Sequence, residues 1–444
     1  MFARNALNDL RRWKDSTARK PLVLRGPRQV GKTTLVNEFA KEFDNYIYLN
    51  LEKADELRLL ELDIPLSDKV TALFARKGLV RKPGTALIFI DEIQNSPRTM
   101  ALLRYFYEEL PEIHVIAAGS LLENVVDVKV SFPVGRVSFL AVRPCSFTEF
   151  LGALGKDNLL TFVRTPELST TMHDELMMLF NQYVVVGGMP EAVARFAENR
   201  DIIAIEDIYE SLLTTYRDDV EKYVRGEKLT EVVRAVLSVG WNFAGEAITM
   251  GNFAETGYPA REVKEAFRLL SRAMLLELVF PTSSSTLPAT PALTRQPKLI
   301  WLDTGLVNYQ AGVRRQVIGA NDVLDVWRGR IAEQVVAQEL LALDSRVSAQ
   351  RAFWSKPRSE AEVDFVYAHN GVLYPLEVKN GHNAKLRSLH TFVGESAVRA
   401  AVRVWSQPFS VDEVVTPSGQ AFRLINLPFY MLNALPSLLD AYAV

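Results

Sequence analysis

The sequence has one cysteine and no apolar run long enough to span a membrane. That cysteine, Cys145 among 444 residues, excludes an internal disulfide, and we expect it to be a small buried hydrophobe in a reducing compartment. The N-terminal residues also lack the apolar core of a signal peptide. These features predict a soluble, cytoplasmic protein with no membrane partner.

A large excess of charge of one sign is also lacking. The formal net charge is -2, so the chain as a whole is not a polycation, and any binding to nucleic acid must come from local basic patches. Hydrophobic residues make up 48% of the sequence, which is enough for roughly two to four domains with cores of their own.

Residues 26–33 have the sequence Gly-Pro-Arg-Gln-Val-Gly-Lys-Thr and fit the phosphate-binding pattern G-x-x-x-x-G-K-[ST]. An expected strand, 22–24, precedes them and an expected helix, 34–41, follows, so the loop lies at a helix N-terminus that favours negative charge. We expect Lys32 to contact the β- and γ-phosphates of ATP and the Thr33 hydroxyl to bind Mg²⁺. The predicted nucleotide-binding residues of this loop are Gly26, Pro27, Arg28, Gln29, Val30, Gly31, Lys32, Thr33 and Thr34.

A second apolar segment, residues 86–90, ends in Asp91 and Glu92. Its unbroken hydrophobicity predicts a parallel strand buried on both faces, with the two acids at the carboxyl end, where open α/β sheets bind ligands. We expect Asp91 to hold Mg²⁺ and Glu92 to polarise the attacking water, because phosphoryl transfer depends mainly on positioning and charge stabilisation. The two motifs together predict hydrolysis of ATP rather than passive binding.

Two further residues suit an oligomeric ATPase. Ser120 follows an expected strand, 115–118, and can either reach the γ-phosphate and the attacking water or cap the next helix. Arg136 precedes another expected strand, 137–142, where it can act on a neighbouring subunit's nucleotide as an arginine finger or be an ordinary solvated arginine.

The sequence resembles AAA+ ATPases, specifically the archaeal-type ATPases in which the P-loop module is fused to a restriction-endonuclease-like C-terminal domain. The resemblance implies ATP hydrolysis and a homo-oligomer, with a hexameric ring favoured, but it gives no substrate. The segments that carry it are 26–33, 88–92, 118–120, 135–136, 143–144, 146–147, 149–150, 187–190 and 303–306.

The predicted fold is α/β, and the pattern of elements changes three times along the chain. Residues 1–150 alternate strands and helices and form the expected AAA+ P-loop domain, and residues 151–228 are mostly helical, with a break at 186–190. Residues 229–311 suggest a winged-helix domain, with short helices and then two strands at 274–280 and 298–302. Residues 312–444 form the expected α/β domain that resembles restriction endonucleases.

Within the predicted winged-helix domain, four cations lie on one face of an expected helix, and apolar residues lie on the other. Winged helices commonly present such a face to nucleic acid, although an ordinary solvated face diluted by Glu262 and Glu265 fits the same pattern. The predicted nucleic-acid contacts are Arg261, Lys264, Arg268 and Arg272.

The C-terminal region contains a predicted β-hairpin. Segments 362–369 and 372–379 flank Asn370-Gly371, the dipeptide typical of a two-residue type I′ turn. Counting outward from this turn pairs apolar residues with one another on one face. On the other face it places Asp364 opposite Glu377 and Glu362 opposite Lys379, and two opposed carboxylates repel unless a positive group lies between them.

This hairpin resembles the PD-(D/E)xK nuclease core, in which an acid on one strand and an acid-x-lysine on the next bind metal and position water. Asp364, Glu377 and Lys379 match those catalytic places, and Glu333 matches an acid on a preceding helix. The resemblance implies that Glu333, Asp364 and Glu377 bind Mg²⁺ or Mn²⁺. A solvated hairpin face with a Glu362–Lys379 ion pair is the alternative.

Together, these observations predict an ATP-hydrolysing AAA+ protein that acts on DNA, including branched or otherwise structured forms, with a nuclease-like domain that cleaves or grips it. Two alternatives remain: a regulatory ATP switch that binds a protein partner, and a DNA-structure remodeller with a non-catalytic nuclease fold.

Overall fold

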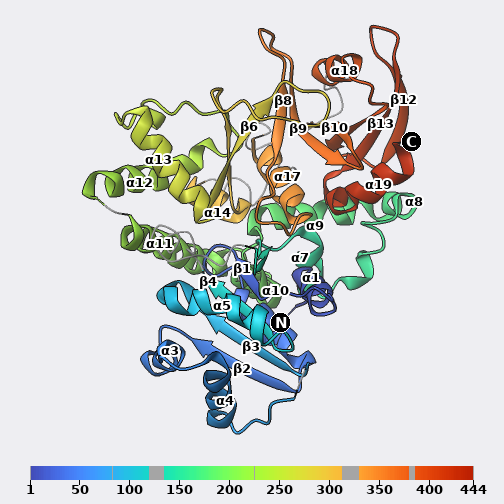
Figure 1. The fold of residues 1–444 in the computed structure, drawn as a ribbon. Helices are drawn as coiled ribbons and strands as arrows, with labels where there is room; N and C mark the ends of the chain where they lie inside the picture. The colour runs from blue at the N-terminus through green and yellow to red at the C-terminus, as the bar shows by residue number, and fades with distance from the viewer. Residues whose placement is uncertain are drawn as a thin grey trace.

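The computed structural model describes residues 2–82, 84–119, 135–224, 226–312, 330–379 and 386–443. Two sheets organise this part of the chain. Figure 1 shows the first sheet in the N-terminal third and the second in the C-terminal half, with helices between them. No helix in these ranges combines the length and apolarity that crossing a membrane requires.

The first sheet consists of five parallel strands in the order β2-β3-β4-β1-β5. Strands β3 and β4 are buried along their whole length, so alternate residues face two separate cores. The strands are β1 (Leu22–Arg25), β2 (Asn45–Asn50), β3 (Ala86–Asp91), β4 (His114–Gly119) and β5 (Ser138–Ala141).

Helices cover both faces of this sheet. One core contains residues of α1 (Ala6–Lys14) and α2 (Lys32–Phe39), and the other contains residues of α3 (Ala54–Glu61), α4 (Leu66–Arg76) and α5 (Pro97–Glu109). The parallel α/β arrangement predicted for the P-loop module is therefore confirmed.

A mainly helical segment follows β5, as predicted. The break expected at 186–190 separates α9 from α10: Val186 is the last residue of one helix, Gly187 ends it and Pro190 begins the next. The helices are α7 (Phe147–Ala153), α8 (Pro166–Ser169), α9 (His173–Val186), α10 (Pro190–Asn199) and α11 (Glu206–Tyr223).

The second sheet has eight strands in the order β12-β13-β11-β10-β9-β8-β6-β7. The two strands predicted for the winged-helix region form the antiparallel pair β6 and β7, and β6 also pairs in parallel with β8. The predicted winged-helix and C-terminal regions thus share one sheet. Its strands are β6 (Leu276–Thr282), β7 (Lys298–Trp301), β8 (Ala352–Ser355), β9 (Glu362–His369), β10 (Val372–Val378), β11 (Ala400–Trp405), β12 (Ser410–Val415) and β13 (Ala421–Pro428).

One hydrophobic core extends from Cys145, which is fully buried as expected, to Leu439 near the C-terminus. It joins the helical segment to the second sheet, and Figure 1 shows α17 near the middle of the molecule. The helices of this half are α12 (Glu227–Val239), α13 (Ala260–Arg272), α14 (Thr304–Gln310), α17 (Arg330–Ala342), α18 (Arg387–Gly394) and α19 (Leu435–Tyr442).

Candidate functional site

The phosphate-binding loop connects β1 to α2. Gly31 has a φ of +88° and Gln29 a φ of +59°, so the loop curls through the left-handed region, which glycine adopts without steric cost. A Cβ on Gly26 would lie 2.4 Å from the carbonyl oxygen of Val142, which only glycine avoids. This backbone suits a loop whose N–H groups turn toward phosphate.

Lys32 begins α2, and its ammonium group donates to the carbonyl oxygens of Gly26 at 2.9 Å and Pro27 at 2.8 Å. Burial lowers the pKa of Lys32 to about 8, although the carboxylates of Glu92 and Asp91 oppose this shift. A bound phosphate would stabilise the charged form of this lysine.

Thr33 and Asp91 meet across the carboxyl edge of the sheet. Thr33 is in the first turn of α2, which follows β1, and Asp91 ends β3. Although β4 lies between β1 and β3, the Thr33 hydroxyl donates to Asp91 Oδ2 at 2.7 Å. The Tyr48 hydroxyl donates to the same oxygen at 3.3 Å. A hydroxyl and a carboxylate in contact are oxygen ligands of the kind that Mg²⁺ prefers, so these residues fit the predicted ion.

Glu92 has a strained backbone. Its φ is +54°, in the left-handed region that residues other than glycine rarely occupy, and such strain is common at functional sites. Its N–H donates to Asp91 Oδ1 at 3.1 Å, and its carboxylate accepts a hydrogen bond from Gln94. The geometry thus places the predicted water-polarising residue directly beside the predicted magnesium ligand.

These residues border one cavity of about 580 Å³, the size of a small-molecule site. Lys32, Thr33, Asp91 and Glu92 belong to its polar part together with Arg28, whereas the N-terminal segment and the start of α10 contribute apolar side chains. The apolar lining residues include Phe2, Leu7, Leu35, Pro190 and Ala194.

Helix α11 also contacts the phosphate loop. The Arg28 guanidinium forms an ion pair with the buried Asp219 carboxylate, and the Tyr216 hydroxyl donates to the Arg28 carbonyl oxygen at 3.2 Å. The sequence assigns Arg28 to the loop but gives no sign of Asp219, since no local pattern connects residues so far apart in the chain.

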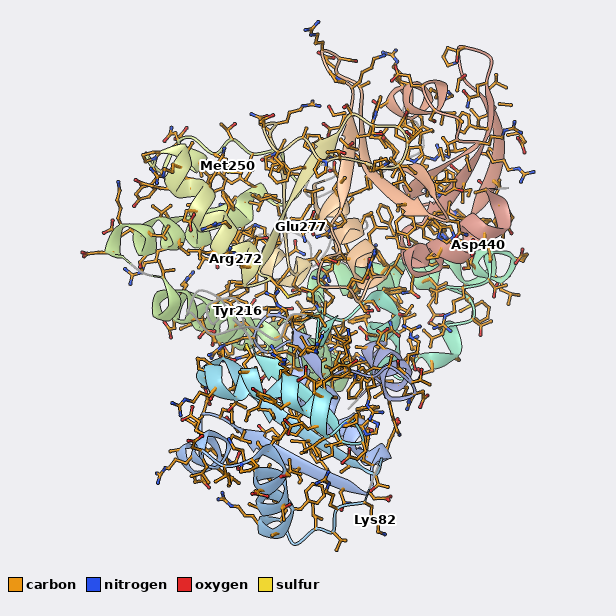
Figure 2. All side chains as sticks on the ribbon, in the orientation of Figure 1. Lys82, Tyr216, Met250, Arg272, Glu277 and Asp440 are labelled. Carbon is orange, nitrogen blue, oxygen red and sulfur yellow. The ribbon has the colours of Figure 1, made fainter. Side chains whose placement is uncertain are left out.

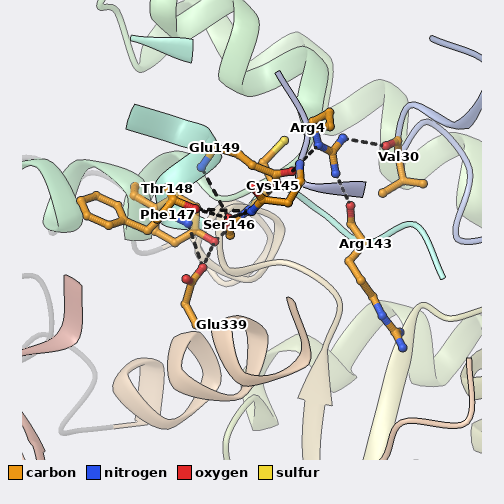
Figure 3. A network of polar contacts seen from close by, with 11 residues as sticks. Arg4, Val30, Arg143, Cys145, Ser146, Phe147, Thr148, Glu149 and Glu339 are labelled. Carbon is orange, nitrogen blue, oxygen red and sulfur yellow. Dashed lines mark hydrogen bonds and ion pairs between the residues drawn. The ribbon is translucent and has the colours of Figure 1, made fainter. Parts of the chain in front are cut away.

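A buried polar network lies on the other side of the loop (Figure 3). The Arg4 guanidinium donates to the carbonyl oxygens of Val30 at 3.2 Å and Arg143 at 2.6 Å, and to Glu149 Oε1 at 3.0 Å. Glu149 also accepts from the Ser146 N–H at 2.9 Å. The network therefore ties the N-terminal segment to the phosphate loop and to the start of α7.

The same network reaches α17. Glu339 Oε1 accepts from the Phe147 N–H at 3.0 Å and from the Tyr183 hydroxyl at 2.7 Å. Burial raises the pKa of Glu339 to about 7. Segments 143–150, which carry part of the family resemblance, thus connect the nucleotide module to the C-terminal half.

Of the two residues suited to an oligomeric ATPase, Ser120 lies outside the described residues. Arg136 lies just before β5, at the amino ends of the parallel strands, whereas the phosphate loop lies at their carboxyl ends. Its exposed guanidinium is 2.8 Å from Glu108. This position keeps Arg136 away from the phosphate loop of its own chain, and its action on a neighbour's nucleotide stays a prediction.

The basic face of α13 borders a groove of about 610 Å³. Lys264, Arg268 and Arg272 line one wall, and Arg295 and Arg351 come from other segments. The predicted contact Arg261 is exposed on the same helix but does not line this groove. Figure 2 shows Arg272, Met250 and Glu277, which belong to the groove lining.

The groove lining contains more cations than anions. Its acid, Glu277, forms an ion pair with Arg351 and accepts from the Arg351 N–H at 2.9 Å. Arg268 has a partner in Glu265 at 2.5 Å, outside the groove lining.

The predicted hairpin register is confirmed from the turn to Phe365. His369 pairs with Val372, Tyr367 with Tyr374 and Phe365 with Leu376. Beyond these pairs, the Val378 N–H donates to Asp364 Oδ2 at 2.8 Å.

A lysine that the sequence patterns do not single out lies among the acids. Lys298 Nζ is 2.8 Å from Glu333, 2.9 Å from Glu362 and 3.5 Å from Asp364. Lys379 Nζ lies 2.6 Å from Glu377. Glu362 and Lys379, which the alternative interpretation paired with each other, therefore have different partners. The only sign of Lys298 in the sequence is its position as a lone lysine at the start of an apolar strand.

The acids of this cluster do not fit a divalent ion in the arrangement observed. An ammonium group already contacts three of the carboxylates, and nowhere in the described ranges do three or more His, Cys, Asp or Glu side chains form a group that could hold a metal ion. The metal-binding roles of Glu333, Asp364 and Glu377 stay predictions.

Three families match successive parts of the chain. Residues 18–151 match the AAA domain family, residues 177–317 match a domain of unknown function, DUF8612, and residues 328–423 match another, DUF4143. No curated protein matches the sequence.

The solved structures that match this chain include two ATPases with low sequence identity to it. The Walker-type ATPase of Pyrococcus abyssi has 16% identity and a TM-score of 0.44, with 70% of this chain and 96% of that chain covered. The second structure is a signal transduction ATPase with numerous domains from Pyrococcus horikoshii, which has a tetratricopeptide repeat sensor. It has 12% identity and a TM-score of 0.29, and the match covers 77% of this chain and 46% of that chain. The AAA domain match and the geometry of the loop together support one conclusion: this chain contains a P-loop ATPase module of the AAA type.

Proposed function

We propose that this protein hydrolyses ATP and uses the resulting conformational change to act on DNA, which it holds in the basic groove beside α13. The groove is the observation that supports action on nucleic acid. Its cations come from several segments, and the acid in its lining is already paired, which favours a polyanionic ligand over a neutral one.

Contact between the groove and the nucleotide module supports coupling of the two activities. Arg25, the last residue of β1, donates through Nη2 to the Arg272 carbonyl oxygen at 3.4 Å. A second cavity, of about 140 Å³, shares Ser271, Glu277 and Arg351 with the groove and reaches Pro27 of the phosphate loop. Movement of this loop on ATP binding would thus change the contacts at the C-terminal end of α13.

A homo-oligomer, with a hexameric ring favoured, belongs to this proposal. Its support is the position of Arg136 at the edge of the sheet away from its own phosphate loop, where a neighbouring subunit's nucleotide could receive it. The rival function is an ATP switch that binds a protein partner through the same groove.

The test is binding of labelled single-stranded, duplex and forked DNA, measured by fluorescence anisotropy over a range of salt concentrations. Lys264→Gln and Arg268→Gln should each weaken binding of all sequences alike. Each should also reduce the slope of log K against log salt concentration, by about 0.7–0.9 for every phosphate that the protein no longer neutralises. Arg261→Gln is the matched control, because this residue is exposed on the same helix but outside the groove.

Equal losses of affinity for Arg261→Gln and Lys264→Gln would assign binding to general surface charge. DNA binding that is undetectable at low salt, with and without ATP, would reject action on DNA and favour the protein-binding switch.

A further inference from the structure

Lys298 joins three elements of the C-terminal half through one ammonium group. It lies on β7, and its three carboxylate partners lie on α17 and β9: Glu333 at 2.8 Å, Glu362 at 2.9 Å and Asp364 at 3.5 Å. The ammonium group also lies 4.9 Å from the ring centroid of Phe353 on β8, within the range of a cation–π contact. Side chains from three elements, α17, β9 and β8, thus surround a lysine that β7 carries.

The lysine is buried and charged. Only 5% of its side chain is exposed. Burial alone would lower the pKa of Lys298, but attraction to Glu333, Asp364 and Glu362 outweighs burial and raises it. A buried ammonium group with close carboxylates is a stable arrangement, whereas the same carboxylates without it would repel one another.

The remaining acid of the cluster has its own partner. Glu377 Oε1 contacts Lys379 Nζ at 2.6 Å, and the second oxygen of Asp364 accepts from the Val378 N–H. Each of the four carboxylates therefore has at least one positive or hydrogen-bonding neighbour in the described structure.

We propose that Lys298 is the resident cation of this acidic cluster and that it excludes a divalent metal ion from it. A metal ion would need the same carboxylate oxygens at about 2.0–2.6 Å, and it cannot share them with an ammonium group without strong repulsion. On this proposal, the C-terminal domain does not cleave DNA by a metal-dependent reaction.

The position of β7 gives this lysine a second role. Strand β7 lies at the edge of the eight-stranded sheet, where it pairs with β6. Through Lys298, the edge strand is bound to α17 and β9 as well as to β6. The lysine therefore fixes the predicted winged-helix hairpin onto the predicted nuclease-like domain.

The experiment measures Mn²⁺ binding to the nucleotide-free full chain, by the electron paramagnetic resonance signal of free Mn²⁺ and by the melting temperature. All proteins carry Asp91→Asn, so that the nucleotide site does not contribute. The parent should show no Mn²⁺-dependent change. Lys298→Met should melt several degrees lower without metal, because three carboxylates lose their cation, and should regain stability and bind Mn²⁺ when the ion is added.

Two further variants complete the test. Lys298→Met with Glu333→Gln and Asp364→Asn should recover stability without Mn²⁺ and lose the response to it. Lys356→Met, which removes an exposed lysine paired with Glu395, should behave as the parent does. If Lys298→Met alone does not fold, its recovery by Mn²⁺ or by the two acid substitutions gives the same answer.

Three results would overturn the proposal. The first is Mn²⁺ binding by the parent that Asp364→Asn abolishes, and the second is Mn²⁺-dependent DNA cleavage by the parent that the same substitution removes. The third is a Lys298→Met protein that neither loses stability nor binds Mn²⁺, or that neither Mn²⁺ nor the acid substitutions restore.

Discussion

The guanidinium of Arg28 in the phosphate loop forms an ion pair with Asp219 of α11. Asp219 is buried, and the hydroxyl of Tyr216, one turn earlier on the helix, donates to the Arg28 carbonyl oxygen. Helix α11 therefore holds the Arg28 side chain, which borders the nucleotide cavity. This contact predicts that α11 affects both the stability of the protein and its use of ATP.

Asp219→Asn should lower the free energy of unfolding by about 1–3 kcal/mol, because it removes the charge partner of a partly buried arginine, and it should change KM for ATP. Urea unfolding and steady-state ATPase assays measure these effects. Asp218→Asn is the control, since that neighbouring acid is exposed. Equal stability and kinetics for the two variants would show that the Arg28–Asp219 ion pair affects neither the folding stability nor the ATPase reaction.

Lys32 and Glu92 should affect ATP turnover in different ways. Lys32→Ala should lose nucleotide binding, because the residue would contact the phosphates, whereas Glu92→Gln should bind ATP and lose turnover by at least about 100-fold. Binding is measured by equilibrium titration with a fluorescent ATP analogue and turnover by phosphate release. Turnover like that of wild type in the Glu92→Gln protein would contradict the assigned role of this carboxylate.

Arg136→Ala should leave ATP binding largely intact and reduce turnover by about 10³-fold, if the residue acts on a neighbour's nucleotide. Mixtures of this variant with Glu92→Gln subunits should regain activity, because some interfaces then contain both an intact finger and an intact carboxylate. Arg104→Ala is the control, since Arg104 also pairs with Glu108. Mixtures that stay inactive at every ratio would leave Arg136 as a surface ion-pair residue.

Glu339 should make stability depend on pH. Burial raises its pKa from 4.5 to about 7, so the folded state binds more protons than the unfolded state between these values. Its contribution is therefore full below about pH 4.5 and is lost as the pH rises through about 7. Between pH 5 and 8 the unfolding free energy of wild type should therefore fall by at most about 3 kcal/mol because of this group. Glu339→Gln should abolish that part of the decline.

Glu198→Gln is the control for this experiment, since Glu198 is exposed on α10. It should keep the pH profile of wild type. A Glu339→Gln profile that runs parallel to wild type would mean that Glu339 does not titrate in this range.

The sequence predicted the features whose cause is local. The glycines and lysine of residues 26–33 determine the phosphate loop, the apolar run before Asp91 determines a buried strand, and Asn370-Gly371 sets the hairpin register that the structure confirms from the turn to Phe365. Such features depend on backbone preferences and on burial within a few residues.

Contacts between distant segments were not predictable in this way. Lys298 and Asp364 are 66 residues apart, and Arg4 and Glu149 are 145 apart. Whether a lysine fills an acidic cluster depends on how β7 packs against β9 and α17, which no periodicity in the sequence specifies. The predicted hairpin register indicated that a positive charge should lie near Asp364 and Glu377, but not that a lysine side chain would supply it.

Helix α17 carries Glu333 near its start and Glu339 less than two turns later, separated by about 9 Å along the axis. Glu333 belongs to the cluster around Lys298, and Glu339 belongs to the network beside the phosphate loop. Because a packed helix moves as a rigid body, a shift of α17 along its axis changes both sets of contacts at once. We therefore expect the network beside the phosphate loop and the packing of the buried strand β7 to respond together to a shift of α17.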